Sequence, residues 1–131
     1  MIFVDSSAWF AIYSRRDANH SIAAQTLTSI QEQLATSDYV IDETLTLLRA
    51  RGENERVEAF GKRVLESNLV KIVSINEQDF ASAWTIFRTF ADKAWSFTDC
   101  TSRVVMQRLG IRQAFAFDEH FRQFGTVTVL P

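Results

Sequence analysis

The sequence contains little glycine, proline or cysteine, and each shortage excludes a kind of architecture. It has four glycines and a single proline, which is the last residue of a 131-residue chain. Because no Gly-rich or Pro-rich stretch divides the chain, we expect one domain spanning residues 1–131. The single cysteine, Cys100, has no partner for an internal disulfide, which is typical of proteins in a reducing compartment.

Long hydrophobic runs are also missing. No stretch approaches the length that crosses a bilayer, and Asp5 interrupts the apolar N-terminal run too early for a signal peptide. We therefore expect a cytoplasmic protein that does not enter a membrane.

An excess of basic residues is absent as well. The chain has 14 Lys and Arg against 16 Asp and Glu, which gives a formal net charge of −2. Dedicated nucleic-acid-binding proteins are usually basic, so the overall charge argues mildly against such a partner. It does not exclude one, because a carboxylate-rich catalytic pocket lowers the net charge and the arginines are clustered. Apolar residues make up 47% of the chain and include eleven Phe, which is enough for a substantial core.

Short β-favouring runs alternate with segments of helical periodicity. The pattern predicts strands at residues 2–4, 36–41, 69–75, 114–117 and 126–130. It predicts helices at residues 6–13, 18–34, 55–67, 96–109 and 119–124, one that carries Glu43, and a long one capped by Asn76. Strands separated by helices indicate parallel βαβ units. The expected class is α/β, as a three-layer α/β/α sandwich with a parallel sheet.

Two of the predicted strands run directly into an aspartate. Asp5 follows residues 2–4, and Asp118 follows residues 114–117. In an α/β sheet the ligand crevice lies outside the carboxyl ends of the strands, so both carboxylates should reach it. Asp99 lies in a capping box with Ser96, at the start of the helix that precedes the strand ending in Asp118, so it can lie at the same edge. Gathered carboxylates repel one another unless protons or a cation lie between them, which points to a divalent metal.

Each of these residues also has a structural interpretation. Asp5 and Asp118 could serve as helix N-caps, although Ser6 and Ser7 are available for that task after the first strand. The residue spacing does not make a metal site of His20 or His120, and we expect local hydrogen bonds or caps from both. The aromatic residues at helical spacing are predicted to lie in the core, including Phe80, Trp84 and Phe87 of the long helix.

Glu43 and its neighbour Asp42 are not separated by the sequence pattern. Both flank the apolar arc of their helix, and periodicity alone leaves open which of them belongs to a site. Taken alone, either is most simply an acid on a solvated helix face.

Taken together, the acidic positions resemble those of the PIN-domain family, in particular the short VapC-type ribonuclease toxins of bacterial toxin–antitoxin pairs. The resemblance covers essentially the whole chain. It is carried by Val4-Asp5-Ser6-Ser7, Glu43 before a leucine-rich helix, Ser96-Phe97-Thr98-Asp99-Cys100, Phe117-Asp118-Glu119-His120-Phe121, and Asp17 with His20.

The resemblance implies a parallel sheet of strand order 3-2-1-4-5 with an acidic pocket at its carboxyl edge. It implies a catalytic quartet, which selects Glu43 over Asp42 and consists of Asp5, Glu43, Asp99 and Asp118. The supporting hydroxyl residues are Ser6 and either Thr98 or Ser96.

The implied activity is a divalent-metal-dependent endoribonuclease that hydrolyses RNA phosphodiester bonds as the toxin of a toxin–antitoxin pair. Mg²⁺ or Mn²⁺ would be held by Asp5, Asp99 and Asp118, because hard cations prefer oxygen ligands. Glu43 would orient or deprotonate the attacking water, or bind a second ion. The implied partners are RNA, a small antitoxin protein as inhibitor and a second copy of the chain in a homodimer.

Two other families that begin with a strand ending in aspartate fit less well. A haloacid-dehalogenase-like phosphatase needs a second aspartate at position 7, which is Ser7 here. A receiver domain needs an acidic pair after the first strand, and this chain has only Asp5 there. A non-catalytic PIN-like module that binds RNA or protein stays open as an alternative. Metal-dependent cleavage would separate the two interpretations.

Overall fold

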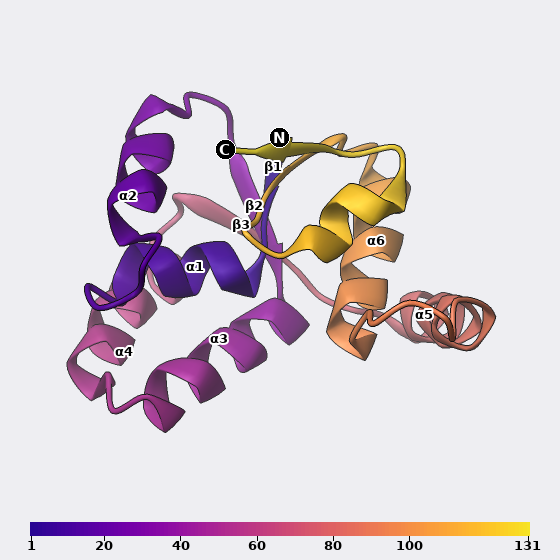
Figure 1. Cartoon of the computed structure of the whole chain (residues 1–131), viewed down its shortest axis with the longest axis horizontal. Helices are drawn as coiled ribbons and strands as arrows, with labels where there is room; N and C mark the ends of the chain where they lie inside the picture. The colour runs from indigo at the N-terminus through magenta and orange to yellow at the C-terminus, as the bar shows by residue number, and fades with distance from the viewer.

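The computed structural model describes residues 1–131 and has a five-stranded parallel sheet (Figure 1). The strands are β1 (Ile2–Val4), β2 (Leu34–Ser37), β3 (Val70–Val73), β4 (Gln113–Phe115) and β5 (Thr128–Leu130). The α-helices are α1 (Ser6–Tyr13), α2 (His20–Ser29), α3 (Asp38–Ala50), α4 (Asn54–Phe60), α5 (Glu77–Thr89) and α6 (Phe97–Leu109). A π-helical turn η1 (Gly61–Leu65) and a 3₁₀ helix η2 (Glu119–Phe124) complete the chain. No helix has the length and apolar character that crossing a membrane requires.

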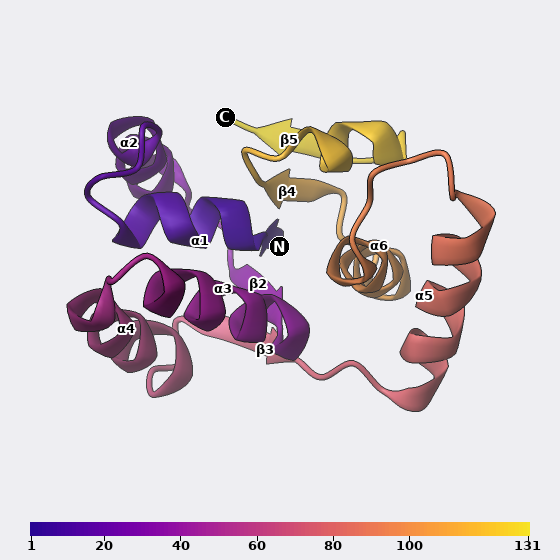
Figure 2. The same ribbon diagram turned by 60° about the horizontal axis from the view of Figure 1, so that its bottom comes forward.

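The helices form a layer on each side of the sheet. Figure 2 shows α1 to α4 on one side and α6, with α5 outside it, on the other. The strand order is β3-β2-β1-β4-β5 and every neighbouring pair is parallel. The predicted three-layer α/β/α sandwich and the order 3-2-1-4-5 are both confirmed.

Strand β1 is the centre of the sheet and of the core. It pairs with β2 on one side and β4 on the other, and all three of its residues are buried. Because a parallel central strand is covered on both faces, it needs the continuous apolar run Ile2-Phe3-Val4 rather than an alternating one. Val4 is opposite Phe115 in β4, so the residues that follow the two strands leave the sheet at the same edge.

Two expected element boundaries are wrong. β2 occupies Leu34–Ser37 rather than residues 36–41, and the helix before it ends at Ser29 instead of continuing to residue 34. Residues 34–37 pair with β3 across four positions, and Ser37 then caps α3 by accepting a hydrogen bond from the Val40 amide. Pairing with neighbouring strands therefore overrides the helical periodicity of this stretch.

The aromatic stripe of α5 is not in the core, contrary to the prediction. Phe80 and Trp84 are each 49% exposed and Phe87 is 40% exposed. α5 packs against α6 and not against the sheet, so only one narrow face of the helix is covered, as Figure 2 shows at its right edge. Ala83 lies on that face and is fully buried. The stripe therefore lies on the surface of the protein.

Candidate active site at the carboxyl edge of the sheet

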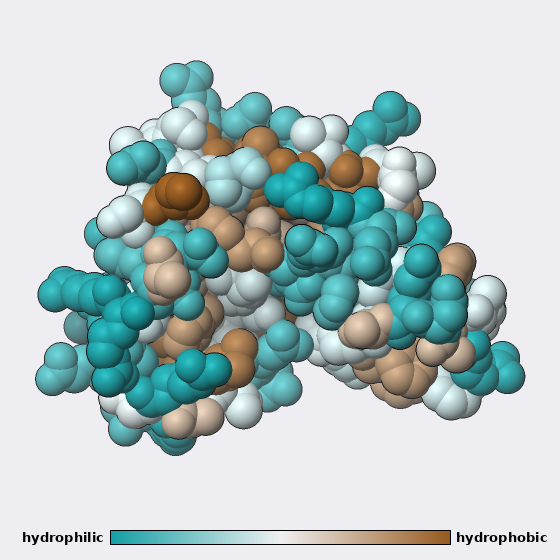
Figure 3. All heavy atoms as spheres, in the orientation of Figure 1, coloured by the Kyte–Doolittle hydropathy of each residue, from teal (hydrophilic) through white to brown (hydrophobic).

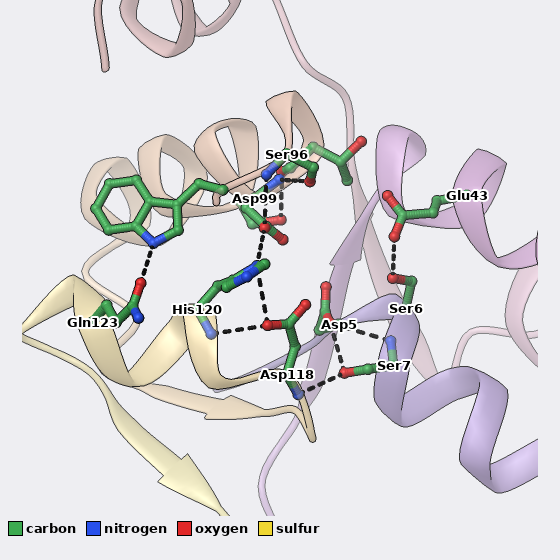
Figure 4. Close-up of polar contacts among 12 residues, drawn as sticks. Asp5, Ser6, Ser7, Glu43, Ser96, Asp99, Asp118, His120 and Gln123 are labelled. Carbon is green, nitrogen blue, oxygen red and sulfur yellow. Dashed lines mark hydrogen bonds and ion pairs between the residues drawn. The ribbon is translucent and has the colours of Figure 1, made fainter. Parts of the chain in front are cut away.

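Four acidic side chains from four different elements lie near the carboxyl ends of the central strands (Figure 4). Asp5 directly follows β1, and Asp118 follows β4 after two residues. Asp99 is in the first turn of α6, and Glu43 is in the second turn of α3. In Figure 4, Asp5, Asp99 and Asp118 surround one space, and Glu43 lies to the side of it.

Asp5 is the N-cap of α1. Its Oδ2 accepts hydrogen bonds from the Ser7 amide at 3.1 Å and from the Ser7 hydroxyl at 2.7 Å. The sequence offered Ser6 and Ser7 for this task, but the structure gives the cap to the aspartate. Asp5 is only 2% exposed, and its Oδ1 accepts no hydrogen bond from the chain.

Asp99 forms the predicted capping box at the start of α6. Its amide donates to Ser96 Oγ, and its Oδ2 accepts from the Ser96 amide at 3.0 Å. The same Oδ2 lies 2.7 Å from Nδ1 of His120. Asp99 is 4% exposed, and its Oδ1 is left without a donor from the chain.

Asp118 caps the 3₁₀ helix η2 in the same manner. Its Oδ1 accepts from the His120 amide at 2.8 Å and lies 3.0 Å from the His120 Nδ1. Its Oδ2 has no donor from the chain. Its side chain is 32% exposed, so it opens the site to solvent.

The three aspartates thus share one arrangement: each uses one oxygen for capping and keeps the other free. Capping holds each carboxylate in a defined orientation, because its donors belong to rigid helix starts. Free carboxylate oxygens are the ligands that a hard divalent cation such as Mg²⁺ or Mn²⁺ prefers. The donor set therefore fits such an ion.

Burial and mutual repulsion make these carboxylates costly to ionise when no cation is present. Burial raises the pKa of Asp5 from 3.8 to about 7, and the charges of Asp99 and Glu43 add to this against the opposing hydrogen bonds from Ser7. Burial also raises the pKa of Asp99, with a further contribution from Asp118, while hydrogen bonds from Ser96 and His120 act in the opposite direction. A cation between these groups would restore their ionised forms.

The structure distinguishes Glu43 from Asp42. Oε1 of Glu43 accepts a hydrogen bond from the Ser6 hydroxyl at 2.6 Å, and the residue is half-buried. Asp42 is exposed and makes no such contact. Ser6 is the residue after Asp5, so this bond joins the start of α1 to α3 and holds Glu43 beside the aspartates.

Ser7 and Thr98 differ in how their hydroxyl groups take part in the site. Ser7 accepts hydrogen bonds at its Oγ from the Phe117 amide at 3.0 Å and the Asp118 amide at 3.3 Å, which joins two strand ends 110 residues apart. Ser7 was not singled out as a supporting residue by the sequence. Thr98 was, yet it is the backbone carbonyl of Thr98, and not its hydroxyl, that accepts hydrogen bonds from the Thr101 and Ser102 hydroxyls.

His120 lies in the site, although its residue spacing predicted only local hydrogen bonds or a capping role. Together with Asp99 and Asp118 it offers three ligand atoms within 4.8 Å of one another. Its bond to Asp99 spans 21 residues, so no local spacing rule could have found it. The available signal was its position two residues after Asp118 within the motif that carries the resemblance. His20, in contrast, donates from Nδ1 to the carbonyl of Ala11, which is nine residues earlier and belongs to α1.

A notch in the surface lies beside the helices that carry Glu43 and Asp99. Figure 3 shows this notch between the part of the molecule formed by α3 and α4 and the part formed by α5 and α6. Figure 1, in the same orientation, shows α3 and α6 beginning at the inner end of the notch. An extended polymer could therefore approach the carboxylates from this side.

Comparisons with known proteins agree with this geometry. A family model described as "PIN domain" matches residues 2–127. A 23S rRNA-specific endonuclease, VapC20 of Mycobacterium tuberculosis, is 36% identical over 132 residues that cover 100% of this chain and 99% of that protein. A VapC ribonuclease of Archaeoglobus fulgidus is 25% identical, covering 90% of this chain and 77% of that protein.

Solved structures show the same fold. The crystal structure of M. tuberculosis VapC20, described as a sarcin–ricin loop cleaving toxin, matches with a TM-score of 0.93 and 34% identity, covering 100% of both chains. A chain from a toxin–antitoxin complex of Klebsiella pneumoniae matches with a TM-score of 0.68 and 15% identity, covering 100% of this chain and 97% of that one, and therefore supports the fold alone. The family match covers nearly the whole chain, and the sheet order and the acidic site agree with it. This chain therefore belongs to the PIN-domain family.

Proposed function

We propose that this protein is a divalent-metal-dependent endoribonuclease and the toxin of a toxin–antitoxin pair. The observation that carries the proposal is the set of three aspartates that each cap a helix with one oxygen and leave the other free. The names of its relatives, an rRNA-specific endonuclease and a VapC ribonuclease, support the same activity. We expect it to act in the cytoplasm, where cellular RNA is found.

In this proposal Asp5, Asp99 and Asp118 hold the cation through their free oxygens. A bound Mg²⁺ or Mn²⁺ would activate water near neutral pH and neutralise charge on the phosphate oxygens. Glu43, held by Ser6, would accept one proton of the water that attacks phosphorus. The new P–O bond would form as the ester P–O bond breaks, and the leaving oxygen would take up a proton from the solvent. Binding of a second ion by Glu43 is the other role that the sequence left open.

The Glu43→Gln variant tests the role of Glu43. We expect its cleavage rate to fall roughly 10²-fold, because glutamine keeps the acceptor for Ser6 but cannot take up a proton. Asp42→Asn is the matched control on the adjacent, exposed position, and its rate should stay within about twofold of the wild type. Both rates would be measured on the same labelled RNA under single-turnover conditions. Equal losses of cleavage rate in the two variants would show that Glu43 has no role that the neighbouring Asp42 lacks.

Cleavage of RNA by the purified, antitoxin-free protein tests the proposal as a whole. Because of the similarity to VapC20, the first substrate is 23S rRNA and a stem–loop copy of its sarcin–ricin loop, followed by pooled structured RNAs. We expect cleavage with Mg²⁺ or Mn²⁺ and none with EDTA. Failure to cut any RNA under any metal condition, together with retained RNA binding, would support the alternative of a non-catalytic PIN-like module.

A second copy of this chain is the proposed occupant of the exposed aromatic face of α5. Phe80, Trp84 and Phe87 are large, partly exposed and carried by one helix, and monomeric proteins seldom expose such a patch. We expect light scattering to show a homodimer and Trp84→Lys to dissociate it. Leu69→Lys, at an exposed leucine beside the edge strand β3, is the control that should remain dimeric. A wild-type monomer would contradict the prediction.

A small antitoxin is the proposed inhibitor. An arginine inserted between the aspartates could pair with their carboxylates and take the place of the cation, which would silence the enzyme. We expect co-expression with a small neighbouring reading frame to relieve toxicity and to yield a stable complex. Toxicity that no neighbouring gene product changes would contradict the toxin role and leave the nuclease chemistry unaffected.

A further inference from the structure

His120 is the one side chain that contacts both Asp99 and Asp118. Its Nδ1 lies 2.7 Å from Oδ2 of Asp99 and 3.0 Å from Oδ1 of Asp118, and the ring is 26% exposed. The two aspartates come from different elements, α6 and the end of β4. The imidazole therefore links two halves of the acidic site that no other side chain connects (Figure 4).

The oxygens that His120 contacts are the same ones that serve as helix caps. Asp99 Oδ2 already accepts from the Ser96 amide, and Asp118 Oδ1 already accepts from the amide of His120 itself. Ionised carboxylates only accept hydrogen bonds, so the imidazole supplies its hydrogen from Nδ1. This leaves Asp99 Oδ1 and Asp118 Oδ2 as the free pair.

We propose that His120 is a positioning residue of the cation site, an inference that rests on the proposed metal-dependent function. By donating a hydrogen bond from Nδ1 to Asp99 Oδ2, and by lying 3.0 Å from Asp118 Oδ1, it holds the two carboxylates in the rotation that presents their free oxygens to a shared cation. Hydrogen bonds of this kind orient metal-binding carboxylates, and their loss typically weakens metal binding or activity 10–100-fold. Nδ1 does not itself bind the ion, because its hydrogen is used in the bond to Asp99 and because Mg²⁺ prefers oxygen.

Substitutions of His120 can test the role of Nδ1 separately from the role of the other ring atoms. The amide nitrogen of asparagine is the same number of bonds from Cα as Nδ1, whereas that of glutamine corresponds to Nε2. His120→Asn can therefore keep the donor to the aspartates, and His120→Gln and His120→Ala cannot. His20→Ala is the matched control, because His20 bonds a backbone carbonyl away from the acids.

The measurement is Mn²⁺ affinity of the RNA-free protein, by calorimetry, after melting curves have shown that each variant is folded. We expect His120→Ala and His120→Gln to lose roughly 10- to 100-fold in Mn²⁺ affinity. His120→Asn and His20→Ala should bind nearly as the wild type does. Electron paramagnetic resonance of Mn²⁺ on the wild-type protein should show no coupling to an imidazole nitrogen.

Three results would overturn the inference. They are unchanged Mn²⁺ affinity in His120→Ala, a wild-type protein that binds no Mn²⁺, and a nitrogen coupling, which would make His120 a direct ligand. Because the readout is metal binding, the test does not depend on cleavage. A wild-type protein that binds Mn²⁺ and cuts no RNA would overturn the proposed nuclease function alone.

Discussion

The Asp99→Asn variant should lose RNA cleavage by roughly 10³-fold or more while keeping its fold. The remaining side-chain oxygen of asparagine can still accept the hydrogen bond from the Ser96 amide, so the capping box of α6 survives. At the free position an NH₂ group replaces Oδ1, and it repels a cation instead of binding it. Single-turnover cleavage at saturating Mg²⁺, together with a melting curve, measures both effects.

Asp79→Asn is a closely matched control for this variant. Asp79 occupies the same capping-box position in α5, accepts a hydrogen bond from the Asn76 amide at 3.2 Å and is 2% exposed. Its two oxygens pair with Arg108 at 2.9 and 2.8 Å rather than facing the candidate site. We expect Asp79→Asn to lower the free energy of unfolding by about 1–3 kcal/mol and to leave cleavage per folded molecule unchanged. If Asp99→Asn cleaved RNA at the wild-type rate, Asp99 would not be one of the residues that bind the metal.

Asp5→Asn should make the metal-free protein more stable at neutral and alkaline pH. The pKa of Asp5 is raised from 3.8 to about 7 in the folded protein, so ionisation above pH 4 favours the unfolded chain. The penalty is absent below about pH 4, grows between pH 4 and 7 and is complete above pH 7. At about 1.4 kcal/mol for each pH unit, the difference in unfolding free energy should reach up to about 4 kcal/mol at pH 8. Asparagine removes this cost and can still accept from Ser7.

Urea denaturation in EDTA at pH 4, 6 and 8 measures this difference. The stabilisation by Asp5→Asn should vanish at pH 4, and the exposed Asp42→Asn should show no comparable trend. Addition of Mg²⁺ should stabilise the wild type and leave Asp5→Asn nearly unchanged, because ligand binding to the folded state adds stability only where the site is intact. A difference in stability that does not grow between pH 4 and pH 8 would show that ionisation of Asp5 carries no cost in the folded protein.

Local sequence patterns were sufficient for the class of fold and for most of the acidic positions. The apolar runs that end in Asp5 and Asp118 predict buried strands with carboxylates at one sheet edge, and both strands are found there. The strand order 3-2-1-4-5 was implied only by the resemblance to the PIN-domain family, and the sheet confirms it. The capping box of Ser96 and Asp99 is also local, because it spans one helical turn. These features depend on residues within a few positions of one another, where periodicity and capping rules apply.

Tertiary structure decided what depends on contacts between distant segments. Periodicity could not choose between Asp42 and Glu43, whereas the bond from Ser6, 37 residues away, distinguishes Glu43. The position of His120 depends on its contact with Asp99, 21 residues away in the sequence. The position of Ser7 depends on its hydrogen bond from the Phe117 amide, 110 residues away. The exposure of Trp84 likewise depends on α5 packing mainly against α6. A hydrophobic pattern states which face of an element is apolar, but only the packed chain determines which neighbour, if any, covers that face.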